Sequence, residues 1–440
     1  MPVYPASEPP EIVAPLPAPK SAALIDALAQ AECPALTARR ARRAEVTGVP
    51  HDPIVWTRAL GSNVWDADGN RYVDLSAGFG AAAVGHNHPE VLDAVRAQSE
   101  RLVHALGDMH PSDTKIALLE KLRALAPFED AKVMLGLSGS DAITAALKTA
   151  LLATGKPGVL AFSGSYHGLD YAPLAACGFS DAFRAPFAAQ LNPHVVFAEY
   201  GDASAAERAF ERAVTPIGAV LVEPVLGRGG VVVPPAAFLR GLAALCKKRG
   251  ALLILDAIMA GLGRNGVWSC GIEHDVPVDL VCLGKALGGG LPVSACLGSA
   301  EVMRAWGDAA HATSGVPLHT GTFFGNPLGC AAALAAIAVM ERERLASRAS
   351  ETGARFVQRL RLRLGTRVRE VRGAGLMIGI DAGAPERGLT AGRKLLEAGY
   401  ITVPAGDGSV ISLTPPLTLE GGLIDGFVDA CDAVLSEGVS

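Results

Sequence analysis

Short apolar runs, separated by turns and amphipathic stretches, occupy the middle of the chain. Three of them, "GAVLVEPV", "ALLILDAI" and "VDLVCLGKA", are apolar without alternation and end near a charged residue. Continuous runs of this length are typical of parallel strands covered on both faces. Intervening segments such as "PPAAFLRGLAALCKKRG" carry apolar residues at helical spacing. The pattern predicts repeated strand, turn and helix, and hence an α/β domain with a mainly parallel sheet.

The flanking segments predict a second, smaller domain. Residues 62–80 alternate like short strands around the turn "DADGN", and after Pro327 helices and strands alternate in an α+β pattern. Upstream of the central sheet, residues 88–106 have the apolar spacing of a helix. A chain of 440 residues also exceeds what one core usually grows to. We expect a Pro-rich arm with a first helix (1–45), the N-terminal part of a small domain (46–90), a large α/β domain (91–330) and the C-terminal part of the small domain (331–440).

Composition narrows the class of protein. The formal net charge is -5 and aromatic residues make up 5%, so neither nucleic acid nor an anionic membrane is an expected partner. The eight Cys residues form no C-x-x-C pair, so we expect no metal site and a reduced, cytoplasmic compartment. The Pro-rich start lacks the basic end and apolar core of a signal peptide, and no apolar stretch reaches transmembrane length.

A Ser/Gly loop follows the first predicted strand of the large domain. In "LSGSDA" a strand ends, a short loop follows and a helix begins. The N–H groups of Gly139 and Ser140 and the hydroxyls of Ser138 and Ser140 can hold a phosphate at the helix N-terminus. The same residues also make an ordinary Ser/Asp helix cap. The loop alone leaves both interpretations open.

Two charged residues stand at the ends of very apolar strands. An unpaired Asp256 carboxylate would be costly there, and a pyridinium N–H would satisfy it while keeping that ring an electron sink. Lys285 follows "VCLG" and precedes a Gly-rich bend, where a partly desolvated amine has a lowered pKa and can form an imine. Taken singly, Asp256 could instead cap its turn, and Lys285 could extend its amine into solvent.

The loop "FSGSYHG" adds an aromatic pair at another strand end. Tyr166 or His167 can stack on a planar ring, although either could be a packed aromatic residue. Ligands of parallel α/β sheets collect at the carboxyl ends of the strands. Asp256 and Lys285, 29 residues apart (285 − 256) and downstream of a phosphate-type loop, are not an arrangement expected by chance. Together these residues predict a site for pyridoxal 5'-phosphate (PLP).

Beyond these residues, the chain resembles the class III (ω-type) aminotransferases, PLP enzymes of fold type I, roughly from Ala59 to Val434. The resemblance is carried by "VWDADGNRYVDLSAGFG", "GHNHPEV", "SGSDAITAALK", "YHG", "VEPVLGRGG", "LDAIMAGLGRNG", "LGKALGGGLP", "GTFFGNP", "VRGAGLMIGI" and "TPPLT". These stretches are specific for the family but not for a substrate. The resemblance implies a large PLP-binding domain with a mainly parallel sheet and a smaller α+β domain.

The resemblance also implies roles for single residues. Lys285 matches the lysine that holds the cofactor as a Schiff base and moves the substrate proton, and Asp256 matches the partner of the pyridine nitrogen. The implied cofactor contacts are Ile258 on one ring face, Tyr166 and His167 on the other, Ser138, Gly139 and Ser140 at the phosphate, and Thr322 at the phosphate of the neighbouring subunit. Thr322 thereby implies a homodimer with shared active sites. Phe79 matches a position that lines the substrate pocket.

Four positions depart from the family pattern. Ala257 and Met259 stand in "DAIM" where a Glu and a Gln are usual. Arg228 replaces the usual Glu of "GEGG", and Ser412 stands before "TPPL" where many members that handle α-amino acids have an Arg. In those members the Glu and the Arg pair when no carboxylate is bound. Since both have changed, we predict that Arg228 contacts the substrate's carboxylate or otherwise tunes the charge of the pocket, because a buried guanidinium needs a partner. The alternative is an exposed Arg at a strand–loop junction.

The leading functional prediction is a transaminase. It would exchange an amino group between an amine or ω-amino acid and an oxo acid by a ping-pong mechanism. An amino acid or amino lactam racemase or epimerase is the main alternative, because these enzymes share "SGSDA" and also lack the Arg before "PPL". Aminomutase and decarboxylase activities remain open. Ala257 keeps a catalytically silent PLP-binding protein in view, although Lys285 and Asp256 argue against it. The donor, the acceptor and the stereochemistry are not determined by the sequence.

Overall fold

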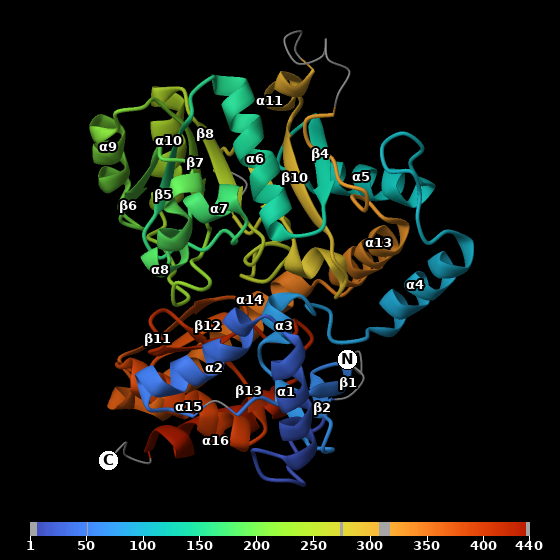
Figure 1. Cartoon of the computed structure of the whole chain (residues 1–440), viewed down its shortest axis with the longest axis vertical. Coiled ribbons are helices and arrows are strands. Elements are labelled where there is room, and N and C mark those ends of the chain that lie inside the picture. The colour runs from blue at the N-terminus through green and yellow to red at the C-terminus, as the bar shows by residue number, and fades with distance from the viewer. Residues whose placement is uncertain (1–6, 51, 273–275, 308–316, 437–440) are drawn as a thin grey trace. The chain divides into compact units, whose positions relative to one another are not determined.

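The computed structural model describes residues 7–50, 52–272, 276–307 and 317–436. Two compact units divide the chain: residues 89–347 form one, and the segments before and after them form the other. Figure 1 shows the central unit in light blue through green to orange, and the other unit in dark blue and in orange to red. The sequence pattern predicted boundaries of the large domain near residues 90 and 330, and the compact central unit spans residues 89–347. The central unit runs on to Ser347 because α13 (Pro327–Arg342) packs on α4 (Pro89–Arg101) and α5 (Asp113–Leu125).

A seven-stranded sheet forms the middle of the central unit (Figure 1). In spatial order its strands are β4 (Ala131–Gly136), β10 (Ser294–Ser299), β9 (Leu280–Leu283), β8 (Leu252–Asp256), β7 (Ile217–Val222), β5 (Gly158–Phe162) and β6 (Val195–Ala198). β10 runs antiparallel to both of its neighbours, and all other pairs are parallel. The predicted α/β fold with a mainly parallel sheet is confirmed.

Packing explains why these strands read as unbroken apolar runs. Every residue of β5, β7 and β9 is buried. The helix α6 (Gly139–Thr154) packs on β9, β10 and β7 through small residues such as Ala142 and Ala146, which allow a close approach. The helices α9 (Ala203–Arg212) and α10 (Phe238–Arg249) contact other strands of the same sheet. The short elements of this unit are α7 (Tyr171–Ala175), α8 (Asp181–Arg184), η1 (Ala185–Gln190), η2 (Lys285–Gly288), α11 (Ala300–Met303) and η3 (Arg304–Trp306).

The sheet brings five loops to one edge. β4, β5, β7, β8 and β9 run in the same direction, so the loops that follow them leave the sheet on the same side. This edge is where α/β sheets bind ligands. The Ser/Gly loop, the "YHG" loop, the "EP" turn, Asp256 and Lys285 all belong to it.

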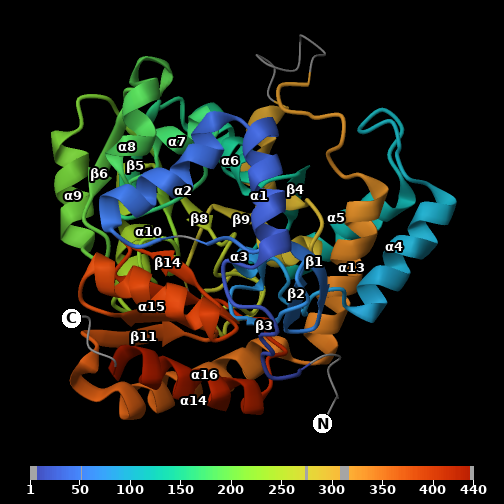
Figure 2. The same ribbon diagram turned by 60° about the horizontal axis from the view of Figure 1, so that its bottom comes forward.

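The other unit contains two four-stranded sheets. One has the order β1 (Trp56–Leu60), β2 (Asn63–Asp66), β3 (Arg71–Asp74), β13 (Tyr400–Ile401), and the other β11 (Glu370–Ala374), β12 (Met377–Asp381), β15 (Val410–Leu413), β14 (Val403–Ala405). Its helices are α1 (Pro19–Ala31), α2 (Pro34–Thr47), α3 (Ala77–Gly80), α14 (Leu345–Leu364), α15 (Pro385–Glu397), α16 (Gly421–Ser436) and the short η4 (Gly365–Arg367). The first residues of α14 belong to the central unit. Figure 2 shows α16 beside α14 and α15, and Arg363 on α14 pairs with Asp432 on α16 at 2.7 Å.

The Pro-rich segment is attached to the β2–β3 hairpin. Glu11 exchanges two backbone hydrogen bonds with Arg71, both 2.8 Å long. The amide oxygen of Asn70, in the "DADGN" turn, accepts the N–H groups of Val13 and Ala14 at 2.8 Å. The described part of the arm is therefore held against the hairpin. Of the helices in the described ranges, none has both the length and the apolar character needed to cross a membrane.

Candidate active site

The Ser/Gly loop caps helix α6 and also presents backbone N–H groups that have no acceptor within the helix. Ser138 is the N-cap of α6: its hydroxyl accepts the N–H of Asp141 at 3.1 Å, and the Asp141 carboxylate accepts the N–H groups of Leu137 and Ser138 at 3.0 and 2.9 Å. Gly139 and Ser140 are the first two helical residues, and the first N–H groups of a helix have no acceptor within it. The cap thus uses Ser138 and Asp141 and leaves the N–H groups of Gly139 and Ser140 able to bind an anion.

Glycines show how closely the loops at this edge approach one another. A Cβ on Gly139 would lie 2.9 Å from Cδ1 of Ile258, and a Cβ on Gly284 would lie 3.2 Å from Cγ2 of the same side chain. Ile258 therefore lies between the Ser/Gly loop and the residue that precedes Lys285. A Cβ on Gly168, which follows Tyr166 and His167, would collide with Oγ of Ser140. Four segments far apart in the sequence meet here.

Asp256 and His167 form a buried pair. Nδ1 of His167 lies 2.7 Å from Oδ2 of Asp256, and Oδ1 of Asp256 accepts the N–H of Ile258 at 3.1 Å. Both side chains are almost fully buried. Nε2 of His167 is buried and has no hydrogen-bond partner among the described residues. The resemblance implied that the pair Tyr166 and His167 supplies a stacking ring; in the structure His167 lies against Asp256, and the Tyr166 ring contacts those of Phe179 and Phe183.

Lys285 begins the turn after β9 in a strained backbone conformation. Its φ is +36°, in the left-handed region that L-residues rarely adopt. Such strain persists where the surrounding structure imposes it, commonly at functional sites. The side chain is largely buried, and this burial lowers the pKa of its amine, while the negative charges of Asp256 and Glu223 oppose the shift. A lowered pKa leaves more of the amine unprotonated and nucleophilic at a given pH.

Glu223, at the end of β7, belongs to the same charged group and was missed by the sequence reasoning. Its oxygens accept the N–H of Tyr166 at 2.8 Å and the N–H of Gly227 at 3.0 Å. Burial raises the pKa of Glu223 to about 7, with His167 lowering it and Asp256 raising it further. The signal was present in "VEP", an acid at a strand end like Asp256, but nothing in the sequence indicated what it would bind.

Arg228 lies among three aromatic rings. Its guanidinium carbon is 4.5 Å from the ring centre of Tyr166, 5.0 Å from that of Phe179 and 5.4 Å from that of Phe183. Within the described ranges, no carboxylate pairs with it. A carboxylate is therefore not the only kind of partner for this guanidinium, because ring faces also attract a guanidinium. The alternative prediction, an exposed Arg at a strand–loop junction, does not include this contact with three rings.

The other predicted positions are spread over both units. Met259 packs its sulfur against Gly227, where a Cβ would collide with it, and Ala257 is buried. Thr322 is exposed on the turn before α13 in the central unit. Phe79 and Ser412 belong to the other unit. Phe79 is 64% exposed and has a φ of +61°, whereas Ser412 is buried in β15, opposite Gly379.

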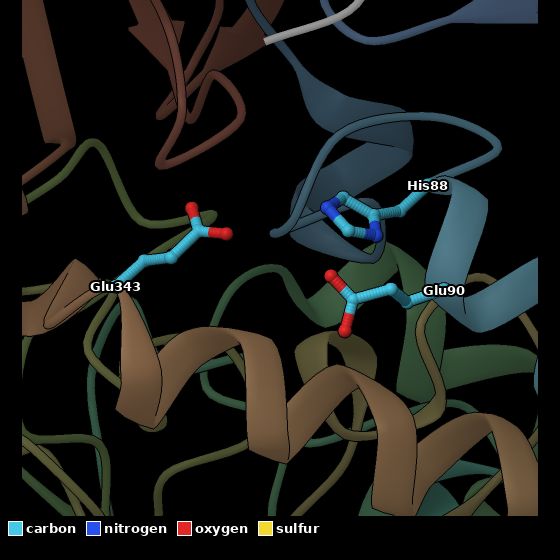
Figure 3. A group of neighbouring side chains, drawn as sticks. All are labelled: His88, Glu90 and Glu343. Atoms are coloured by element: carbon cyan, nitrogen blue, oxygen red, sulfur yellow. The ribbon is translucent and has the colours of Figure 1, made fainter. Parts of the chain in front are cut away.

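A separate acidic cluster is neutralised by an arginine. Figure 3 shows Glu90, at the start of α4, and Glu343, just after α13, with His88 on the preceding loop. Arg342 donates to both oxygens of Glu90 at 2.7 and 2.6 Å and to Glu343 at 3.0 Å. These ion pairs join α4 to α13. Since both carboxylates already have a cationic partner, the cluster gives no reason to infer a metal site.

The comparisons with known proteins agree with this architecture. The model of the class III aminotransferase family matches residues 46–435. The acetylornithine aminotransferase of Methanopyrus kandleri is 37% identical over 387 residues, which cover 88% of this chain and 95% of that protein. The ornithine aminotransferase structure from Toxoplasma gondii has a TM-score of 0.79 and 29% identity, covering 88% of this chain and 90% of its own. A thermostable omega transaminase structure has a TM-score of 0.82 and 25% identity, covering 90% and 95%.

This chain belongs to the class III aminotransferase family and has its fold-type-I architecture. It is a PLP-dependent transaminase.

The residues at the sheet edge fit PLP. A buried carboxylate at Asp256 suits a protonated ring nitrogen, a Lys285 amine with a lowered pKa suits an aldehyde, and the start of α6 suits a phosphate. A side chain at Gly139 or Gly284 would press on Ile258, so these glycines let the two loops approach closely around it. When bound, PLP supplies the reactive aldehyde and an electron-accepting ring. The site's own residues supply binding, orientation and proton movement.

Proposed function

We propose that this transaminase moves an amino group from an amine or ω-amino acid to an oxo acid by a ping-pong mechanism, with Lys285 and Asp256 as its catalytic residues. The observation that carries the proposal is the meeting of Lys285, the Asp256–His167 pair and the start of α6 at one sheet edge. The names of the relatives support the donor class, because ornithine and acetylornithine each carry a terminal amine and a carboxylate.

Each residue has a distinct role in this proposal. Lys285 would hold the cofactor through its aldehyde, and its amine would be the base that moves the substrate proton. Asp256 keeps a proton on the ring nitrogen, and His167 fixes its carboxylate by the 2.7 Å contact. The proposed cofactor contacts are Ile258 and Tyr166 at the ring faces, and Ser138, Gly139 and Ser140 at the phosphate.

Spectroscopic half-reactions test this function. An ω-amino acid or primary amine added to the PLP-loaded enzyme should convert the cofactor to its amine form in one stoichiometric step, because transfer needs only one mobile base. Added pyruvate or 2-oxoglutarate should then restore the aldehyde absorbance. A racemase would instead keep the aldehyde-type spectrum while one enantiomer of an amino acid loses optical activity over many turnovers.

We further propose that Arg228 binds a substrate carboxylate. The guanidinium lies near three rings and pairs with no carboxylate among the described residues, so its N–H groups are candidates for binding a planar, bidentate partner. With Ser412 in place of an arginine, Arg228 is the candidate cation for this task. Ser412 and Phe79 are proposed substrate-pocket positions; the strained and exposed Phe79 is the kind of residue that function, rather than stability, retains.

The Arg228→Met variant separates the charge of Arg228 from its bulk. It should raise KM for oxo acids and ω-amino acids roughly 10- to 100-fold, the value of a lost charge-assisted hydrogen bond. A primary amine without a carboxylate should react at its former rate. Half-reaction kinetics with each donor type, run without oxo acid, measure the difference, and Arg228→Lys should be intermediate because it keeps charge but loses the planar fork. Equal effects on both donor types would contradict the proposal.

We propose a homodimer with shared active sites, in which Thr322 reaches the partner's cofactor phosphate. An exposed apolar surface supports it: Phe323, beside Thr322, is 57% exposed and contacts the ring of His104 at 5.2 Å, and Leu106 and Met109 on the adjoining loop are 57% and 73% exposed. Such patches commonly mark protein interfaces. Sedimentation of the fully active enzyme as a monomer would contradict this assembly.

A further inference from the structure

Glu223 is a buried acid to which the proposed chemistry gives no task. It is 5% exposed at the carboxyl end of β7. One oxygen accepts the N–H of Tyr166, 57 residues away in the chain, and the other accepts the N–H of Gly227 in the turn that carries Arg228. A single side chain therefore joins the loop after β5 to the turn after β7.

The two joined segments also pack directly on each other. A Cβ on Gly229 would collide with the carbonyl oxygen of Gly164, so the backbones touch where only glycine fits. The guanidinium of Arg228 lies over the Tyr166 ring at 4.5 Å. Tyr166 is thus held at its backbone by Glu223 and covered on its ring by Arg228.

We propose that Glu223 is a positioning residue of the cofactor site, which sets the place of the Tyr166 ring and, through Gly227, of Arg228 above it. An ionised carboxylate accepts on both oxygens, whereas the glutamine amide has one accepting oxygen and a nitrogen that only donates. Glu223→Gln therefore leaves one buried N–H opposed by another donor, and one of the two segments must move. The inference rests on the proposed contact of Tyr166 with the cofactor ring.

Titration of the apoenzyme with PLP, followed by fluorescence at pH 8, tests the proposal. At this pH most of Glu223 is ionised, since burial raises its pKa only to about 7. Glu223→Gln should weaken PLP binding about tenfold, the cost of one lost hydrogen bond to a charged group. Tyr166→Ala should also weaken binding. The double variant should be no worse than Tyr166→Ala alone, because Glu223 acts through Tyr166.

Asp279 offers a matched control. It is also a largely buried acid, whose carboxylate accepts the N–H of Leu253 at 2.7 Å, but it precedes β9 at the opposite edge of the sheet. Asp279→Asn should lower the melting temperature and leave the Kd for PLP unchanged. A purely structural role for Glu223 would make Glu223→Gln behave in the same way and would overturn the proposal, as would fully additive losses in the double variant.

Amide hydrogen exchange of the apoenzyme distinguishes failure of this inference from failure of the Tyr166 assignment. An unchanged Kd in Tyr166→Ala would remove the proposed ring contact, yet the amides of Tyr166 and Gly227 should still exchange faster in Glu223→Gln than in the wild type. Unchanged exchange at both amides would refute the tether itself. Should Glu223→Gln fold poorly, Glu223→Asp keeps two accepting oxygens on a stem one methylene shorter and should give the same changes at smaller size.

Discussion

Lys285→Ala is expected to fold normally and lose turnover, with kcat reduced by at least about 10³-fold. The variant lacks both the amine that attacks the cofactor aldehyde and the base that moves the substrate proton. The fold should persist because burial disfavours the charged form of this lysine, so removing it relieves a cost instead of breaking a pair. Rapid-mixing kinetics and thermal unfolding followed by circular dichroism measure the two effects.

Lys132→Ala is a suitable control for that experiment. Lys132 is exposed on β4 of the same sheet, so its loss should leave kcat unchanged. Turnover by Lys285→Ala within tenfold of the wild type would show that another group performs both steps.

Asp256→Asn is expected to lower kcat roughly 10²- to 10³-fold, the size seen when one preorganised electrostatic contact is removed. The amide has the shape of the carboxylate and can still bond to His167, so the fold and the pair geometry should survive. The uncharged amide does not stabilise a protonated ring nitrogen, and a ring whose nitrogen is neutral is a poor electron sink. Single-turnover rates at saturating PLP measure the loss.

Two further measurements make the Asp256 result specific. The Kd for PLP should change much less than kcat, because the phosphate, the ring faces and Lys285 still hold the cofactor. Asp279→Asn, the same chemical change at the opposite sheet edge, should retain normal turnover. If Asp256→Asn kept its full rate, the carboxylate would serve His167 and the fold instead of the cofactor.

Local patterns predicted the strands and the acidic and basic residues at their ends. β7, β8 and β9 are continuous apolar runs because helices cover the sheet, and parallel direction alone brings Asp256 and Lys285 to one edge. By contrast, the contacts of Arg228 with Phe179 and Phe183 cross about 50 residues of chain, so no local pattern could show them. The division of roles between Tyr166 and His167 likewise depends on which ring reaches Asp256.

Residues 88–106 show a different limit. Their apolar spacing predicted one helix, but α4 ends at Arg101, and Leu102, Val103 and Leu106 are exposed on the following loop. Hydrophobic periodicity indicates a buried face without saying what buries it. The proposed partner subunit would cover those residues, and an apolar interface of that kind would have the same sequence pattern as the core face of a helix.

Chemical trapping of the cofactor tests the central claim most directly. The PLP-loaded enzyme, reduced with borohydride, digested and analysed by mass spectrometry, should carry the phosphopyridoxyl group on the peptide that contains Lys285. The same treatment of Lys285→Ala should label no peptide to that extent. Stoichiometric labelling of a different lysine in the wild-type enzyme would contradict the assignment of Lys285 and the site built around it.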